Sequence, residues 1–255
     1  MRPPTQRVAA GRPRAGSAGR LDRRTGGIPT VWLAGIAIVA VALAVAVASG
    51  AIRLGGGPIT GGGGASIAPG GPAGGIAGCP GAQPAAAPAG STKTVTIQTA
   101  KGSIELTLKA DLSPIAVGNF VALASCGFYD NVVFHRVVPN FVIQAGDGQF
   151  GRTTAFDPDR AGSGGPGYDI QDEGVTTPYQ RGTVAMARGR GPNSAGSQFF
   201  IVLSDQAQAS LASANTYQIL GSVTNGIEVA DAIAAAADAE KPSRPVAMTK
   251  LTVAP

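Results

Sequence analysis

The 255-residue sequence is short of the side chains on which most enzyme chemistry depends. It has one histidine, two cysteines and one tryptophan, and no Gly-x-Ser-x-Gly segment to present a nucleophile. His135 is therefore the only imidazole that a Ser-His-Asp or Cys-His system could use. Two cysteines 47 residues apart lack the spacing of a zinc site, and no glycine-rich loop ends in Lys-Ser or Lys-Thr. The sequence predicts a site with no metal and no cofactor.

Charge is also sparse, at 14% of residues, and the net charge of +5 is concentrated at one end. Residues 1–24 hold seven arginines and one acid, which leaves thirteen basic and fourteen acidic residues in the rest of the chain. The high isoelectric point therefore belongs to the tail, and we expect no nucleic-acid partner for the folded part.

An uncharged apolar run of eighteen residues, 31–48, follows the tail. At about 1.5 Å per residue such a helix can cross a hydrocarbon layer of roughly 30 Å. The arginines before it predict a cytoplasmic tail (1–27), a single transmembrane anchor (28–52) in the cell membrane and an extracytoplasmic remainder. The alternative is a secreted protein whose signal peptide is cleaved near Ala48, after the Ala-Val-Ala segment.

Residues 53–90 contain 14 glycines and 6 prolines, which predicts a flexible linker before a domain at 91–255. Within that domain, alternating residues predict a hairpin over 94–109. Ser113 and Pro114 are typical of a helix start, and an apolar stripe at 226–239 predicts a second helix. Further short strands are expected at 133–138, 141–145, 183–187, 198–203, 217–223 and 248–253. The fold class is mainly β, a closed barrel whose ends are covered by two helices.

The segment FHRVVPNFVIQAGD, residues 134–147, places an arginine among apolar side chains. Removing a guanidinium from water costs free energy, so Arg136 is expected to have hydrogen-bonding or ionic partners or a functional role. With the turn at 139–140 between two strands, Arg136, Phe141 and Gln144 are expected to share a cleft. The alternative is a buried arginine paired with a carboxylate such as Asp147.

Together with GPNSAGSQFFI at residues 191–201, this segment resembles the cyclophilin-type peptidyl-prolyl cis-trans isomerases, here of a membrane-anchored bacterial type. The similarity runs from about residue 94 to the C-terminus. It implies a closed eight-stranded antiparallel barrel capped by two helices, with a substrate groove on its outer face. It also implies an enzyme that speeds rotation about X-Pro bonds without a cofactor.

By position, Arg136 resembles the family's catalytic arginine, and Gln144 and Gln198 resemble the residues that hold the peptide and the arginine. The resemblance also gives the residues that would line the substrate groove: Phe141, Val142, Phe200 and Leu211 around the proline ring, Ala187 and Arg188 beside the preceding residue, and Tyr217. His135 is expected to be a structural barrel residue. A tryptophan common in the family is absent, since Ser210 takes its place.

The expected function is isomerisation of X-Pro bonds during the folding of extracytoplasmic proteins, by a monomer that binds proline-containing polypeptides. Two alternatives are a non-catalytic peptide-binding chaperone and an envelope assembly module.

Cys79 and Cys126 both follow the apolar run, so the expected orientation places them where disulfides persist. We predict a bond between them that ties the linker to the domain. The alternative is two unrelated free thiols.

Overall fold

The computed structural model describes residues 76–255, which form a nine-stranded sheet with three α-helices and one 3-10 helix. The strands are β1 (Thr92–Thr99), β2 (Gly102–Lys109), β3 (Val132–Val133), β4 (Arg136–Val138), β5 (Val142–Ala145), β6 (Thr183–Arg188), β7 (Ala195–Val202), β8 (Ile219–Asn225) and β9 (Ala247–Val253). The helices are α1 (Pro114–Ser125), η1 (Asp205–Ala207), α2 (Gln208–Ala214) and α3 (Ile227–Ala235). The expected tail, the expected anchor at 28–52 and residues 53–75 of the expected linker lie outside the described residues.

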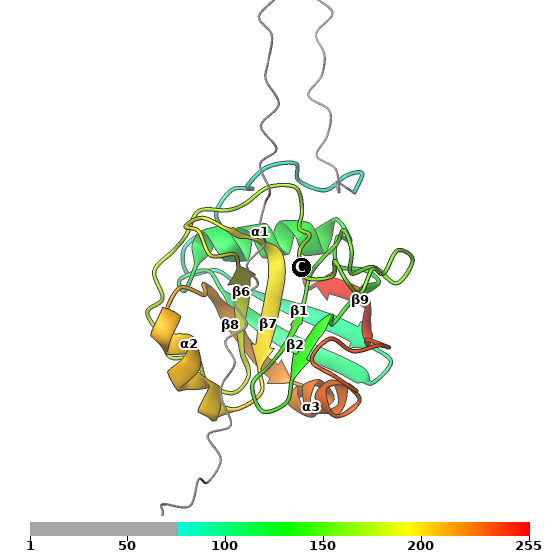
Figure 1. Ribbon diagram of the computed structural model, residues 1–255. Coiled ribbons are helices and arrows are strands. Elements are labelled where there is room, and N and C mark those ends of the chain that lie inside the picture. The colour runs from blue at the N-terminus through cyan, green and yellow to red at the C-terminus, as the bar shows by residue number, and fades with distance from the viewer. Residues whose placement is uncertain (1–75) are drawn as a thin grey trace, which may run out of the picture. The chain divides into compact units, whose positions relative to one another are not determined.

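The strands follow the order β3-β9-β1-β2-β8-β6-β7-β5-β4, and every neighbouring pair is antiparallel. The mainly β class is confirmed, but the closed eight-stranded barrel is wrong. Residues 76–255 form nine strands, and the edge strands β3 and β4 do not pair with each other. The sheet is curled, as Figure 1 shows, and remains open along one seam.

The seam arises because the strand expected at 133–138 breaks into two. Val133, Phe134 and His135 are all buried, so the expected alternation of sides fails there. The chain pairs with β9 before the break and with β5 after it. Since only two residues separate β3 from β4, the covalent chain itself joins the two edges of the sheet.

The core lies on the inner face of the curled sheet. The hairpin β1–β2 confirms the alternation expected at 94–109, because Val95, Ile97, Ile104, Leu106 and Leu108 are fully buried. Figure 1 shows α1 and α3 at opposite ends of the sheet, as the barrel prediction required, and α2 to one side. Helix α2 was not expected from the sequence, and its only buried residue is Leu211.

Helix α1 packs into this core through aromatic contacts. The Phe120 ring lies 4.9 Å from that of Tyr129 and 5.2 Å from that of Phe199, between ring centroids. Ser113 is the expected N-cap, but its hydroxyl donates to the Leu112 carbonyl instead of capping the helix.

The first backbone N–H groups of α1 bind a carboxylate from far along the chain. Ile115 and Ala116 donate to the two oxygens of Glu173 at 2.8 and 2.9 Å. An anion at this position also interacts favourably with the helix dipole. The helix start is therefore fixed by a long-range contact as well as by Pro114.

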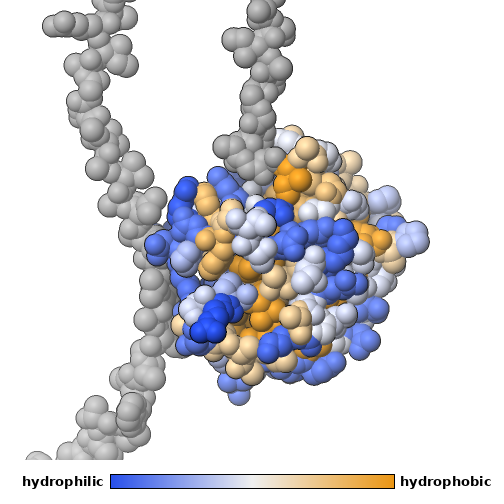
Figure 2. All heavy atoms as spheres, turned by 90° about the vertical axis from the view of Figure 1, so that its right-hand side faces the viewer, coloured by the Kyte–Doolittle hydropathy of each residue, from blue (hydrophilic) through white to orange (hydrophobic). Residues whose placement is uncertain are grey.

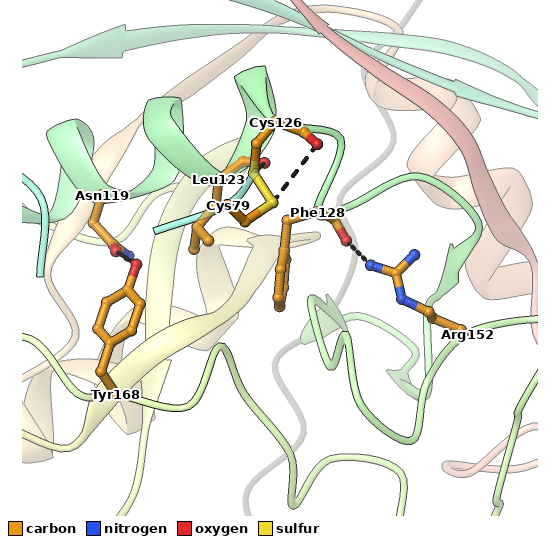
Figure 3. The surroundings of a disulfide bond; sticks show 7 residues. All are labelled: Cys79, Asn119, Leu123, Cys126, Phe128, Arg152 and Tyr168. Atoms are coloured by element: carbon orange, nitrogen blue, oxygen red, sulfur yellow. Dashed lines mark hydrogen bonds between the residues drawn. A yellow bond between two sulfur atoms is a disulfide. The ribbon is translucent and has the colours of Figure 1, made fainter. Parts of the chain in front are cut away.

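Residues 76–91, which we call the strap, lie against the domain although most of them were assigned to the flexible linker. Ile76, Cys79 and Ala87 pack against the core cluster, and the Ala87 N–H donates to the Pro114 carbonyl at 2.8 Å. The predicted disulfide is confirmed, with Cα atoms 5.2 Å apart. Figure 3 shows the Cys79–Cys126 bond at the end of α1, beside Phe128.

The strap also explains the glycine inside α1. A β-carbon at Gly118 would overlap with the Ala85 carbonyl oxygen and would lie 2.8 Å from the Ala87 nitrogen. Glycine is normally unfavourable inside a helix by about 1 kcal/mol. Here it lets the backbone of the strap lie directly on the helix.

The face seen in Figure 2 has a mixed surface, on which apolar side chains emerge among hydrophilic ones. Among residues 76–255, no helix has both the length and the apolar character needed to cross a membrane.

Removing the disulfide should lower the free energy of unfolding, because the bond closes a loop with a sequence separation of 47 residues. The chain-entropy model gives about 4 kcal/mol for a loop of this length. We expect a Cys79→Ser/Cys126→Ser variant to unfold at lower urea concentration than the oxidised protein and to be insensitive to reductant. Equal urea midpoints for the oxidised, reduced and double-serine proteins would contradict this.

Candidate active site

A row of side chains crosses three neighbouring strands on the outer face of the sheet. In the register, Arg136 on β4 lies opposite Gln144 on β5, and Gln144 lies opposite Phe200 on β7. Directly paired residues project to the same face of a sheet. Their neighbours Val137, Ile143 and Phe199 belong to the inner core. The strands therefore bring a cation, an amide and an aromatic ring together, as the motif at 134–147 predicted for Arg136 and Gln144.

A second apolar cluster lies beside this row and is distinct from the core. Its buried members are Val142, Tyr179, Ala185, Phe200, Val202, Ala207, Leu211 and Ile219, with Leu112, Phe141, Val175, Ala187 and Tyr217 packed against them. All six of the apolar or aromatic residues expected to line the groove are in this set. The rings of Phe200 and Tyr217 meet edge to face, with centroids 5.4 Å apart. Tyr179, whose hydroxyl donates to the Tyr217 carbonyl, is a member of the cluster that was not expected from the sequence.

Two glutamines connect the row to a long loop. The Gln144 amide donates to the Gln198 side-chain oxygen at 2.9 Å. The Gln198 amide in turn donates to the carbonyls of Gly162 and Gly164 at 2.9 and 2.8 Å. These contacts hold Gln198 between the sheet and the loop and fix the orientation of Gln144. Neither glutamine binds Arg136 directly among the described contacts.

Asp147 organises that loop. Its carboxylate is fully buried and accepts hydrogen bonds from four backbone N–H groups, those of Gln149, Phe150, Gly162 and Gly164. The alternative in which Asp147 pairs with a buried Arg136 is therefore wrong. The Asp147 carboxylate is occupied by the turns that shape one wall of the site.

A cavity of about 530 Å³ opens between this loop and the ends of β6 and β7. Gln144, Ala187, Arg188 and Gln198 line it together with residues 162–169. The cavity thus extends from Gln144, in the row with Arg136, toward Ala187 and Arg188. These two are the residues expected to contact the substrate residue before proline.

Arg188 lines the cavity, but its guanidinium binds other groups of the protein. It forms an ion pair with Asp172 at 3.1 Å and donates to the Thr216 and Gly191 carbonyls. Only 10% of the side chain is exposed. Arg188 therefore shapes the groove and holds the loop at 191–193 against β6.

Arg136 is half-buried and has a carboxylate partner that was not expected from the sequence. Its Nε lies 2.7 Å from the Glu240 carboxylate, and 36% of its side chain is exposed. Glu240 lies in the segment after α3, 104 residues away along the chain. No local pattern marked it, because the contact depends on how that segment returns to β4.

His135, next to Arg136, is buried at 4% exposure and lies in the break between β3 and β4. Neither ring nitrogen has a hydrogen-bond partner among the described residues. Burial lowers the pKa of His135 to about 4, although the nearby Asp147 raises it. A neutral, buried imidazole agrees with the structural role expected from the sequence. Residues 76–255 also contain no group of three or more His, Cys, Asp or Glu side chains placed to hold a metal.

Comparison with known proteins identifies the domain. Residues 94–253 match the family model described as cyclophilin type peptidyl-prolyl cis-trans isomerase/CLD. A probable peptidyl-prolyl cis-trans isomerase of Brucella suis is 39% identical over 162 residues, which are 63% of this chain and 81% of that protein. Peptidyl-prolyl cis-trans isomerase B of Bacillus subtilis is 39% identical over 129 residues, 50% of this chain and 80% of its own.

Solved structures agree with the sequence comparisons. A crystal structure of a Cryptosporidium parvum cyclophilin type isomerase is 28% identical with a TM-score of 0.53, and the match covers 65% of this chain and 99% of that one. A second crystal structure of that isomerase, in the presence of the dipeptide Ala-Pro, is 29% identical with a TM-score of 0.52 and matches 64% of this chain and 99% of its own.

The buried imidazole should make stability depend on pH. The folded pKa is about 4 and the unfolded value is near 6.5, so the unfolded chain binds a proton that the folded chain refuses. The free energy of unfolding should therefore fall as the pH drops from 6.5 to 4, by an amount on the order of 3 kcal/mol from this residue.

Urea unfolding of the wild type and a His135→Gln variant across that range measures the effect, because the same carboxylates are present in both proteins. The difference between the free energies of unfolding of the two proteins should shrink as the pH falls. Parallel curves would contradict a depressed histidine pKa.

Proposed function

The chain belongs to the family of cyclophilin-type peptidyl-prolyl cis-trans isomerases, and from this membership we propose that Arg136 is the catalytic residue of a site that rotates X-Pro bonds. The observation that carries the proposal is the register that aligns Arg136, Gln144 and Phe200 on the outer face. The enzyme's substrates are proline-containing polypeptides.

The reaction needs no covalent chemistry. Resonance in the amide gives the C–N bond a rotational barrier of about 18–20 kcal/mol, and uncatalysed X-Pro isomerisation takes tens to hundreds of seconds. In the twisted transition state the nitrogen lone pair is localised and accepts a hydrogen bond that the planar amide cannot accept. A guanidinium placed beside that nitrogen stabilises the transition state more than either ground state.

The apolar cluster places the reacting bond. A proline ring seated against Phe200, Val142 and Leu211 would bury apolar surface, and the register would then hold Arg136 two strands away from Phe200 on the same face. The side-chain oxygen of Gln144 is then in position to accept from the peptide backbone, because its amide group already donates to Gln198.

The cavity lined by Ala187 and Arg188 extends the site toward the residues before proline. This arrangement suits a short X-Pro segment of an extended chain. The related Cryptosporidium isomerase was crystallised in the presence of Ala-Pro, a ligand of the same chemistry.

We further propose that this isomerase works outside the cytoplasm, held to the membrane by the anchor at 28–52, and assists the folding of extracytoplasmic proteins. The run and the seven arginines before it support the orientation. The Cys79–Cys126 bond supports an oxidising compartment, because disulfides are rare in reducing ones. Cleavage near Ala48 and secretion is the alternative with the same compartment.

Arg136→Ala should lower kcat/KM for a proline-containing peptide by about 10²-fold or more, the usual loss on removing one preorganised donor. Arg136→Lys keeps the charge but not the planar set of donors. Its kcat/KM should therefore lie between those of the wild type and Arg136→Ala. Both variants should unfold at wild-type urea concentrations, since the exposed ion pair adds little stability. Rates near those of the wild type in Arg136→Ala would contradict the catalytic role of Arg136. A wild-type protein that does not exceed the uncatalysed rate would favour a non-catalytic peptide-binding function.

Membrane fractionation tests the proposed location. The protein should sediment with membranes and stay there in high salt, because an apolar span is extracted by detergent whereas a basic tail is released by salt. A variant in which the seven tail arginines are replaced by glutamine should remain salt-resistant. Release of a fragment beginning after Ala48 would support secretion instead.

A further inference from the structure

The pairing of Arg136 with Glu240 leaves part of the guanidinium available. The contact is made through Nε, at 2.7 Å from Glu240 Oε1. The two terminal nitrogens form no hydrogen bond with any residue of the range 76–255. Five N–H groups lie in one plane in arginine, so a carboxylate that binds the Nε edge fixes the direction in which the terminal edge points.

Glu240 is itself held in place by the strand that carries Arg136. Its backbone carbonyl accepts a hydrogen bond from the Val137 N–H at 2.8 Å. Farther along the same segment, the Val246 carbonyl accepts from the Phe134 N–H at 2.9 Å. Within the segment, the Ser243 N–H donates to Asp238 at 2.9 Å. The carboxylate therefore comes from a backbone that is anchored at Glu240 and at Val246 to residues 134–137.

The ion pair is poorly suited to a stabilising role. The Arg136 and Glu240 side chains are 36% and 61% exposed, and pairs in water contribute little to folding. A long arginine side chain at an open site would otherwise sample many rotamers, of which few direct its terminal nitrogens along the strand row. Restricting those rotamers before substrate arrives favours catalysis through orientation.

We propose that Glu240 is a positioning residue for the isomerisation, which binds the Nε edge of Arg136 and aims its terminal nitrogens at the amide nitrogen of the bound X-Pro bond. The inference rests on the proposed catalytic role of Arg136. It adds a carboxylate that takes no part in the chemistry and touches no substrate atom.

Glu240→Ala should lower kcat for a proline-containing tetrapeptide by roughly three- to tenfold, between the small effect of an exposed pair and the large effect of a misplaced catalytic group. KM should stay within about twofold, because the apolar cluster that binds the proline ring is unchanged. Glu240→Gln keeps an acceptor oxygen for Nε and should recover most of the rate.

Asp231→Ala provides a matched control. Asp231 lies on α3 and pairs with Arg181 at 2.6 Å, and their side chains are 46% and 38% exposed. This pair therefore resembles the Arg136–Glu240 pair but includes no residue of the row at Arg136. The control should keep the wild-type kcat, and both variants should keep wild-type urea midpoints.

The double variant Arg136→Ala/Glu240→Ala distinguishes the positioning role of Glu240 from the catalytic role of Arg136 on which it rests. Positioning requires that Glu240→Ala has no further effect once Arg136 is absent. The positioning role would be overturned if Arg136→Ala lowers kcat but Glu240→Ala has a kcat equal to or above that of the wild type. The catalytic role of Arg136 would still stand in that case. Equal losses from Glu240→Ala in both backgrounds would also overturn the positioning role. A wild-type rate in Arg136→Ala would instead remove the catalytic role itself.

Discussion

The register of β5 between β4 and β7 is the constraint on which both faces of the domain depend. Successive residues of a strand project to opposite faces, so a shift of one residue exchanges every inward side chain for an outward one. Here β5 directs Ile143 into the core and Gln144 toward the outer row. The same backbone hydrogen bonds therefore stabilise the core and set the spacing of the site.

Buried or half-buried carboxylates extend that order into the loops. Asp147 binds four backbone N–H groups around the loop at 162–164, and Glu173 binds the first turn of α1. Glu173 also accepts from Gln218, whose amide reaches the Gln171 carbonyl. Loops without regular pairing thus satisfy their polar backbone through side chains, as buried N–H groups require. The loops that form the walls of the groove are held in place by the hydrogen bonds to these carboxylates.

Sequence patterns predicted the elements whose signal is local. The hairpin at 94–109 alternates along its length, and Arg136, Gln144 and Phe200 lie in motifs that fix their strands. Helix α2 escaped because QASLASA carries a single large apolar side chain and no stripe. The seam at Phe134 and His135 escaped because apolar residues continue through it, and only the choice of partner strand changes. Glu240 could not be predicted at all, since its contact with Arg136 joins positions 104 residues apart.

The strap changes how mechanical load would enter the domain. Force applied to the chain before Cys79 passes through the disulfide to Cys126 at the end of α1, because a covalent bond is the stiffest connection available there. The β1–β2 hairpin lies between the two cysteines in the sequence and is bypassed. A pull from that side would thus strain a helix end packed beside Phe128 and leave the pairing of the first two strands unloaded.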